Sequence, residues 1–434
     1  LPDSVTFIGE YAFYGFTKLT GILKIPKFVT SICNYSFSKC YGLSELIISD
    51  SVTSIGSHAF SECTGLNGQL TIPISVKTIS DNAFYCCKRF TKLVLNNNLK
   101  KIGNSAFCEC SGLAGSLNIP DSVEIIEDYA FYSCYGFNGS LKIGNSLKNI
   151  SEFTFTGCNN LAGTLSIGKS VETINDYSFR DFRKITGDLI IPDSVTYIGV
   201  KAFYKCESLN GSIFFGNSLK TIEVYSFYGC SKLIGSLVIP NSVTFLGYDA
   251  FGRCFGLNGS LVIGNSIKTI EYHMFKDCKE LSGNLTIGDS VERIEKEAFS
   301  GLSKLIGVLN IPNSVTYIGD SSFYGCSGFN SSLHLPDKVE FIGSNAFALC
   351  SGLYGPLNIP NSLKEIGNYA FYECIGLNES LTIGNSLKTI GSYTFSGINS
   401  FSGTLTIGNN VTKIDSKAFK DFGFIEKESN RECL

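Results

Sequence analysis

A phenylalanine recurs at an almost constant interval along the whole chain, and this period limits the folds that the sequence can adopt. The interval is 24 residues, except for two intervals of 23 that end at Phe60 and Phe107. A fixed period of about 20 to 50 residues is typical of solenoids, in which each repeat buries its apolar side only by stacking on its neighbours. The 18 aligned positions are Phe13, Phe37, Phe60, Phe84, Phe107, Phe131, Phe155, Phe179, Phe203, Phe227, Phe251, Phe275, Phe299, Phe323, Phe347, Phe371, Phe395 and Phe419.

Every repeat has the same apolar pattern when residues are numbered from its phenylalanine as position zero. Apolar side chains occupy positions plus 3, plus 6, plus 10, plus 12, plus 16 and plus 19. The alternation at plus 10 and plus 12, as in Leu237 and Ile239, predicts a short strand that a Pro or Gly at plus 13 ends. The segment from plus 16 to plus 19 predicts a second short strand, and the tight spacing from zero to plus 3 predicts a short helical turn.

These elements predict a repeat solenoid of about 18 coils of 23 or 24 residues, elongated and curved. Equivalent strands of successive coils should pair in parallel at about 4.8 Å. With 44% hydrophobic residues and 34 phenylalanines, the chain can build one continuous core. We expect a single repeat domain over residues 1–425 and a charged C-terminal tail over residues 426–434. The first repeat is truncated, because Leu1 and Pro2 match Ile191 and Pro192 of a later repeat.

Charge and hydropathy exclude two classes of partner. The formal net charge is −3 and the isoelectric point is about 5.8, so the chain as a whole has no basic field for nucleic acid or anionic lipid. No apolar run approaches the roughly 18 residues that a membrane-spanning helix needs. We therefore expect neither nucleic-acid binding nor membrane insertion by this segment.

Two segments carry a resemblance to a known family. IPDSVTYIGVKAFYKC (Ile191–Cys206) and LTIGNSLKTIGSYTF (Leu381–Phe395) closely resemble the BspA-like, Treponema-type leucine-rich repeats of surface proteins from oral bacteria and anaerobic parasitic protists. The resemblance extends from Leu1 to about Ile425. It implies a leucine-rich-repeat solenoid used for adhesion to host or bacterial surfaces, often with a membrane anchor outside the repeats.

No group of residues in the sequence predicts a catalytic, cofactor-binding or metal site. His58 and His273 share position minus 2 but lie nine coils apart, and His334 occupies position plus 11, so we expect three separate surface histidines. The segment GDSV, residues 288–291, imitates a nucleophile motif, but other repeats have the turn residues GNSL or PDSV in its place. We therefore expect a non-enzymatic protein without a cofactor.

The cysteines follow the repeat. Of 17 cysteines, 13 occupy position plus 3, where the other five repeats have Phe16, Phe182, Leu302, Ile398 and Phe422. A position shared with such residues is a buried apolar position, in which free cysteine packs as a small hydrophobic residue. Disulfides between adjacent coils are the alternative that the spacing permits. The 13 residues are Cys40, Cys63, Cys87, Cys110, Cys134, Cys158, Cys206, Cys230, Cys254, Cys278, Cys326, Cys350 and Cys374.

Five of the nine N-x-S/T sequences share position plus 7, at Asn138, Asn210, Asn258, Asn330 and Asn378. One interpretation is that an Asn-Gly-Ser sequence is suitable turn chemistry before a strand. The other is a row of N-linked glycans along one edge of a secreted solenoid.

Two rows of exposed positions are candidates for recognition. Charged residues at plus 17, such as Lys148, Glu172, Lys220, Lys268 and Glu292, form either a recognition stripe or an ordinary solvated strand face. Position plus 11 lies between two buried residues and should point to solvent. At plus 11, four consecutive coils are apolar and are bordered by polar residues at plus 9. The predicted patch consists of Ile190, Phe214, Val238 and Val262, with Asp188, Ser212, Ser236 and Ser260 beside them.

The patch has two interpretations, and so has the whole chain. Ile, Phe and Val suit strands whether or not they bind anything, whereas an apolar run with a polar border is typical of an interface.

We expect a cell-surface or extracellular binding protein whose partner is a protein or glycan on a host or neighbouring cell, or a second copy of the chain. The alternative is a rigid scaffold or spacer in an intracellular or larger assembly, which the many thiols favour.

Overall fold

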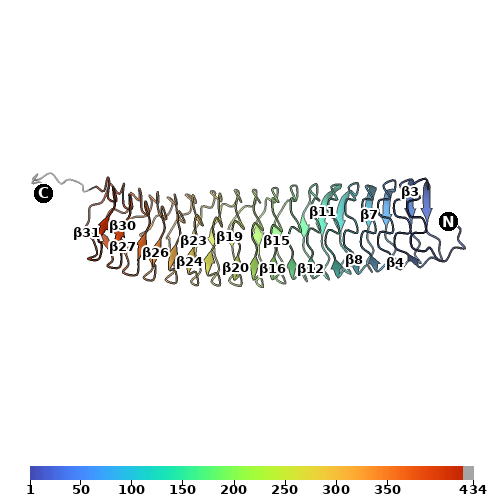
Figure 1. Ribbon diagram of the computed structural model, residues 1–434, viewed down its shortest axis with the longest axis horizontal. Helices are drawn as coiled ribbons and strands as arrows, with labels where there is room; N and C mark the ends of the chain where they lie inside the picture. The colour runs from blue at the N-terminus through green and yellow to red at the C-terminus, as the bar shows by residue number, and fades with distance from the viewer. Residues whose placement is uncertain (424–434) are drawn as a thin grey trace, which may run out of the picture. The chain divides into compact units, whose positions relative to one another are not determined.

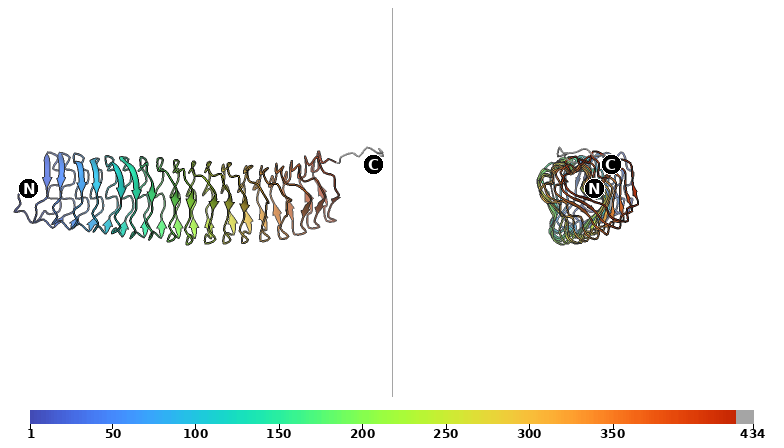
Figure 2. Two further views of the ribbon diagram at one scale, coloured as in Figure 1. Left: turned by 180° about the vertical axis from the view of Figure 1, so that it is seen from behind. Right: turned by 90° about the vertical axis from the view of Figure 1, so that its left-hand side faces the viewer.

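The computed structural model describes residues 1–423, which fold as a parallel-strand β-solenoid. These residues divide into two compact units, unit 1 from Leu1 to Leu233 and unit 2 from Ile234 onward. In each unit the chain winds through successive coils, and most coils add a strand to each of two rows (Figure 1). Figure 2 shows the two rows of unit 1 from behind. The predicted tail at 426–434 lies outside the described residues.

The first row contains the strands that include position plus 10, and it forms short parallel sheets in the orders β1-β3, β5-β7, β9-β11-β13, β15-β17, β19-β21-β23 and β27-β29-β31. In unit 1 its strands are β1 (Gly21–Lys24), β3 (Leu43–Ile47), β5 (Asn67–Thr71), β7 (Arg89–Val94), β9 (Gly115–Asn118), β11 (Phe137–Lys142), β13 (Leu165–Ser166), β15 (Leu189–Ile190) and β17 (Ile213–Phe214). In unit 2 they are β19 (Leu237–Val238), β21 (Leu261–Val262), β23 (Leu285–Thr286), β27 (Leu357–Ile359), β29 (Leu381–Ile383) and β31 (Leu405–Thr406). Between β23 and β27 the first row has only isolated bridges, such as Asn310 with His334.

The second row contains two-residue strands that end at position plus 19, or at plus 18 in the two coils of 23 residues. In unit 1 they are β2 (Ser31–Ile32), β4 (Ser54–Ile55), β6 (Thr78–Ile79), β8 (Lys101–Ile102), β10 (Ile125–Ile126), β12 (Asn149–Ile150), β14 (Thr173–Ile174), β16 (Tyr197–Ile198) and β18 (Thr221–Ile222). In unit 2 they are β20 (Phe245–Leu246), β22 (Thr269–Ile270), β24 (Arg293–Ile294), β25 (Tyr317–Ile318), β26 (Phe341–Ile342), β28 (Glu365–Ile366), β30 (Thr389–Ile390) and β32 (Lys413–Ile414). Neighbouring strands pair in parallel without a shift of register.

The core is a set of identical side-chain positions stacked from coil to coil. Leu237 and Ile239 are buried while Val238 between them is 50% exposed, which confirms the predicted alternation in the first strand. The repeated phenylalanines form the stacked row that the period predicts, with neighbouring ring centroids 5.1 to 6.2 Å apart within each unit. Burying each such ring contributes about 1.5–3 kcal/mol, so this row is a main source of stability.

The predicted helical turn is not a helix, and the described residues contain no helix that could cross a membrane. Around Phe37, the N–H of Ser38 donates to the carbonyl of Tyr35 (3.2 Å) and that of Cys40 donates to Phe37 (3.2 Å). The alternate N–H groups, of Phe37 and Lys39, donate to the next coil instead, to the carbonyls of Ala59 (2.9 Å) and Ser61 (2.8 Å). Because alternate N–H groups bond along the stacking axis, they cannot form the continuous internal ladder of a helix.

Two residues in every coil have a left-handed backbone, which explains this alternation. They stand at positions minus 2 and plus 2, and examples are Tyr35 (φ 54°) and Lys39 (φ 62°). Most are not glycine, although a left-handed conformation costs a non-glycine residue about 1–2 kcal/mol. The hydrogen bonds to the next coil offset this cost, since each reversed peptide gains a partner there.

Candidate binding surface

The predicted apolar patch is at the surface, but it falls into two pairs. In unit 1, Ile190 and Phe214 are register partners in β15 and β17 and are 61% and 53% exposed. In unit 2, Val238 and Val262 are partners in β19 and β21, where Val238 is exposed and Val262 is partly buried. Within each pair the apolar side chains lie side by side on the outer face of the strands. That they bind a partner remains a prediction.

The polar residues beside the patch have structural roles. The carboxylate of Asp188 accepts the backbone N–H of Ser212 (2.8 Å), and the hydroxyl of Ser236 accepts that of Ser260 (3.0 Å). The hydroxyl of Ser260 in turn accepts the N–H of Asn284 (3.2 Å). These side chains therefore hold the start of the first strand in the next coil. They are partly committed to the fold rather than fully available to a partner.

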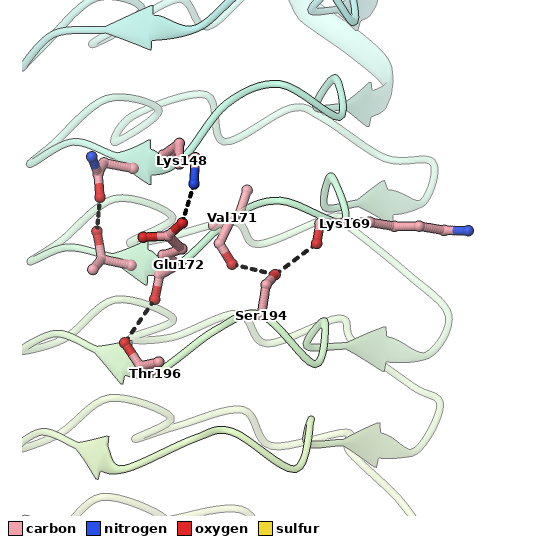
Figure 3. Close-up of polar contacts among 8 residues, drawn as sticks. Lys148, Lys169, Val171, Glu172, Ser194 and Thr196 are labelled. Carbon is pink, nitrogen blue, oxygen red and sulfur yellow. Dashed lines mark hydrogen bonds and ion pairs between the residues drawn. The ribbon is translucent and has the colours of Figure 1, made fainter.

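The charged row at plus 17 consists largely of ion pairs between adjacent coils. Lys148 pairs with Glu172, and the carbonyl of Glu172 accepts the hydroxyl of Thr196 one coil further on (Figure 3). Lys268 and Glu292 form the same kind of pair at 2.6 Å in unit 2. These side chains are about half exposed, so each pair is worth at most about 1 kcal/mol. The pairing supports the interpretation of an ordinary solvated strand face.

The asparagines at plus 7 have a structural partner that the sequence did not reveal. The side-chain oxygen of Asn210 accepts the N–H of Gly187 in the preceding coil (2.9 Å), and Asn138 contacts Gly115 in the same way (2.9 Å). Both glycines are left-handed, with φ of 88° and 84°. Asn258 and Asn330 make the same bond, and all five asparagines are exposed. This contact gives four of the five asparagines a structural role, while glycan occupancy remains a prediction.

The cysteines at plus 3 lie in the core as predicted. All 16 cysteines in residues 1–423 are free thiols, and every one except Cys33 is buried. In addition, the thiol of Cys230 donates to the carbonyl of Phe203 in the preceding coil (3.2 Å), and equivalent contacts of 3.0 to 3.4 Å recur along the row. Burial raises the pKa of the Cys326 and Cys374 thiols to about 12. Cys433 lies outside the described residues.

The three histidines lie apart from one another, and only His334 is well exposed. His58 stacks on Tyr35 with 4.5 Å between ring centroids, and burial lowers the pKa of His58. The expectation of a surface residue is wrong for His273, whose side chain is only 13% exposed. Its Nε2 lies 2.8 Å from a carboxylate oxygen of Glu297 in the next coil. These two residues share position minus 2, and stacking one coil on the next brings them together. No group of side chains that could hold a metal ion occurs in the described part of the chain.

The sequence alone did not predict a second surface. It is the turn edge, formed by the residues at positions minus 2 and plus 1 of stacked coils. There aromatic rings of adjacent coils stack on one another, as in Tyr129 on Phe153 (4.9 Å) and Phe153 on Tyr177 (4.6 Å). Lys201 continues the row and lies 5.5 Å from the ring centre of Tyr177. The signal was present as aromatic and basic residues at fixed repeat positions, but their contact requires the stacked coils.

The chain resembles known proteins over nearly its whole length. The family model described as BspA type leucine rich repeat region matches residues 1–114, 113–234, 182–306, 233–354 and 306–426. Among solved structures, a leucine-rich repeat protein from Bacteroides ovatus is 26% identical, with a TM-score of 0.58 over 88% of this chain and 91% of that chain. No curated protein sequence matches.

Two further solved structures match the chain with lower TM-scores. A leucine rich cell surface protein from Faecalibacterium prausnitzii is 22% identical, with a TM-score of 0.30 over 90% of this chain and 88% of that chain. A leucine-rich repeat protein from T. pallidum is 26% identical, with a TM-score of 0.34 over 38% of this chain and 77% of that chain. Since the family model matches almost the entire sequence, the chain belongs to the BspA-type leucine-rich repeat family.

Proposed function

We propose that the chain is a non-enzymatic binding protein of the cell surface or extracellular space, which recognises a protein or glycan partner with exposed side chains of its first-strand row. The observation that carries the proposal is the pair Ile190 and Phe214, which are 61% and 53% exposed in adjacent register. Membership of a leucine-rich repeat family supports a binding role, since such repeats present long regular surfaces.

The exposure of this pair is not a requirement of folding. In the same strands Leu189 and Ile213 supply the buried contacts, and the two preceding coils have Lys142 and Ser166 at the equivalent outer position. Two adjacent exposed apolar side chains lose water when a partner covers them, at about 25 cal/mol per Å². They are therefore suited to a small apolar centre of an interface.

Binding of the labelled chain to intact host cells and to arrays of extracellular-matrix proteins and glycans tests the proposal. We expect Ile190→Lys with Phe214→Lys to reduce binding to the array component retained by the unchanged protein, by about tenfold or more. Ser166→Lys is the matched control, because Ser166 is exposed at the same position of a neighbouring strand. Equal binding by the double variant, with an unchanged melting temperature and unchanged oligomeric state, would contradict the proposal.

A structural scaffold inside the cell is the second candidate function. The 16 free thiols in residues 1–423 favour it, because thiols persist more readily in a reducing compartment. Proteolysis and labelling of intact cells that produce the native protein separate the two functions. A surface protein is labelled and cleaved from outside, whereas an intracellular scaffold is protected until the cells are lysed.

A further inference from the structure

Two consecutive coils of unit 1 carry basic side chains that lie on aromatic rings of three consecutive coils at the turn edge. We call the following residues the turn-edge cluster: Tyr177, Arg180, Lys201, Tyr204, Lys205, Tyr225 and Tyr228. They come from positions minus 2, plus 1 and plus 2 of the coils of Phe179, Phe203 and Phe227. The patch of the first-strand row lies at other positions of the coil, so the two surfaces can be altered separately.

The cations of the cluster are held in place by the rings. The ammonium nitrogen of Lys201 lies 5.5 Å from the ring centre of Tyr177, 5.7 Å from that of Tyr204 and 5.5 Å from that of Tyr225. The guanidinium of Arg180 lies 5.7 Å from Tyr177 and 5.8 Å from Tyr204. Such contacts attract a cation without neutralising it. The charge of Lys201 therefore remains available to an anion, whereas Arg180 also pairs with Asp181 (3.2 Å).

The stacked rings keep their own positions as well. Tyr204 stacks on Tyr228 at 5.5 Å, and Tyr225 meets Tyr228 edge to face at 5.3 Å. Lys205 lies over Tyr204 at 5.4 Å. Because neighbouring coils cover part of the ring faces, a neutral sugar has little open face on which to stack. Recognition at this edge must depend on charge and on hydrogen bonds.

Basic residues outnumber acidic residues on this edge. The turn segments 175–184, 199–208 and 223–232 contain six basic and four acidic residues, in a chain with a net charge of −3. Asp181 pairs with Arg180 and Arg183 (both 3.2 Å) and offsets part of the positive charge of the first segment, and Asp176 accepts the N–H of Val200 (2.8 Å). In contrast, the preceding segments 127–136 and 151–160 contain three acidic residues and no basic residue. These three coils thus differ from the two coils before them in having an excess of basic residues at the turn edge.

Lys201 and Lys205 differ from the lysines of the plus 17 row. There, Lys148 and Lys268 pair with a glutamate of the next coil. Within residues 1–423, neither Lys201 nor Lys205 has a carboxylate within ion-pair distance, and both lie on tyrosine rings instead. Two unneutralised cations on one coil, next to Arg180 on the preceding coil, form a row complementary to a line of negative charges.

We propose that the turn-edge cluster binds an acidic polysaccharide, a glycan whose carboxylate or sulfate groups recur along the chain. The two coils that carry these cations stack at the strand spacing of about 4.8 Å, so their charges suit a ligand with regularly spaced negative groups. The hydroxyl groups of the tyrosines can exchange hydrogen bonds with sugar hydroxyls. An acidic protein segment is the less suitable partner, because protein interfaces need apolar anchors in well-packed pockets and this edge offers cations and polar-tipped rings.

The test measures binding of the full chain to heparin and to hyaluronate at low and at high salt. We expect binding at low salt that falls as salt screens the charges, and no binding to neutral dextran. The variant Lys201→Gln with Lys205→Gln should bind at least about tenfold more weakly, whereas Lys201→Arg with Lys205→Arg should retain binding. The matched control is Lys92→Gln with Lys142→Gln, which removes the same charge from exposed first-strand positions of unit 1.

Three results would overturn the proposal. They are no binding of either polysaccharide by the unchanged chain, an equal loss in the Lys92 and Lys142 control, and tighter binding of polyglutamate than of both polysaccharides, which would indicate an acidic protein partner. Circular dichroism and melting temperature establish that each variant is folded. The variant Phe214→Lys, which tests the first-strand row, should leave polysaccharide binding unchanged, so failure of one proposal is distinguishable from failure of the other.

Discussion

Each cysteine at position plus 3 fills a small apolar space and also donates a hydrogen bond. The carbonyl of Phe203, for example, accepts the thiol of Cys230 from the next coil (3.2 Å) and the N–H of Cys206 from its own coil (3.3 Å). A carbonyl has two lone pairs, so the thiol satisfies an acceptor that valine or alanine would leave with one partner. This second role gives a physical reason for cysteine rather than another small apolar residue.

The raised pKa values of the buried Cys326 and Cys374 thiols predict that the folded chain becomes less stable in alkaline solution. Burial raises the pKa of Cys326 and Cys374 to about 12, whereas a thiol in the unfolded chain has a pKa of about 8.5. Stability is unaffected below about pH 8.5, where both states are protonated. Above it the unfolded state loses protons first, so the free energy of unfolding falls by about 1.4 kcal/mol per pH unit for each such thiol.

Urea unfolding at pH 7.5 and pH 9.5 measures this decline. Cys326→Val is the matched variant, since leucine and isoleucine occupy the same position at Leu302 and Ile398. We expect the variant to lose about 1.4 kcal/mol less than the unchanged chain between the two pH values, because it has one fewer buried thiol to ionise. An identical loss in both proteins would show that the buried thiols do not control alkaline stability.

At the scale of the element, each coil is held to the next by side chains that cap backbone groups. Asp188 and Ser236 accept the N–H at the start of the following first strand, and Asp320 accepts that of Ser344 (2.7 Å) at the turn. The strands have only two to six residues and provide few ladder bonds of their own. Side-chain caps from the neighbouring coil therefore contribute much of the order at the ends of these elements.

The Gly187 N–H donates a hydrogen bond to the side chain of Asn210, so the structural role of this asparagine can be tested separately from glycosylation. Asn210→Ala removes the acceptor and should lower the free energy of unfolding of unit 1 by about 1 kcal/mol. Asn210→Asp keeps the Oδ1 acceptor and should lose about half as much or less. Both changes abolish the N-x-S sequence, so a glycan effect would be the same in both variants. Thermal unfolding of unglycosylated protein measures the difference, and equal destabilisation would contradict the capping role.

On the scale of the whole molecule, stability is a sum of contacts between nearest neighbours. The Phe107 ring contacts Phe84 at 5.4 Å and Phe131 at 5.2 Å, in the two adjacent coils. In a stacked array of this kind, each repeat contributes its own term and two interface terms. A defect in one coil should therefore be felt mainly by its neighbours.

Replacing a single ring of the core tests this locality. Phe107→Ala should cost about 3–5 kcal/mol, through lost burial and the cavity that remains. Hydrogen exchange measured by mass spectrometry should show faster exchange around residues 84–131 and little change in unit 2. Phe323→Ala is the matched variant in unit 2, where Phe323 contacts Phe299 at 5.1 Å and Phe347 at 5.2 Å. A uniform increase over both units in either variant would contradict nearest-neighbour stability.

The sequence by itself determined the solenoid, the parallel strands, the stacked phenylalanine row and the buried cysteines. These follow from apolar positions that repeat in register, because each coil buries the same side chains as the last. It also placed Ile190 and Phe214 at the surface correctly, since an alternation of two is a local property of a strand.

Only the tertiary structure decided which groups meet across coils. The predicted helical turn became a pair of turns with left-handed residues such as Tyr35 and Lys39, because hydrogen bonds to the next coil compensate a conformation that residue type does not predict. In the same way, Asn210 meets Gly187, and Lys201 meets Tyr177 and Tyr225. These contacts join residues about one repeat apart in the chain, and they exist because stacking brings equivalent positions of neighbouring coils within reach of a side chain.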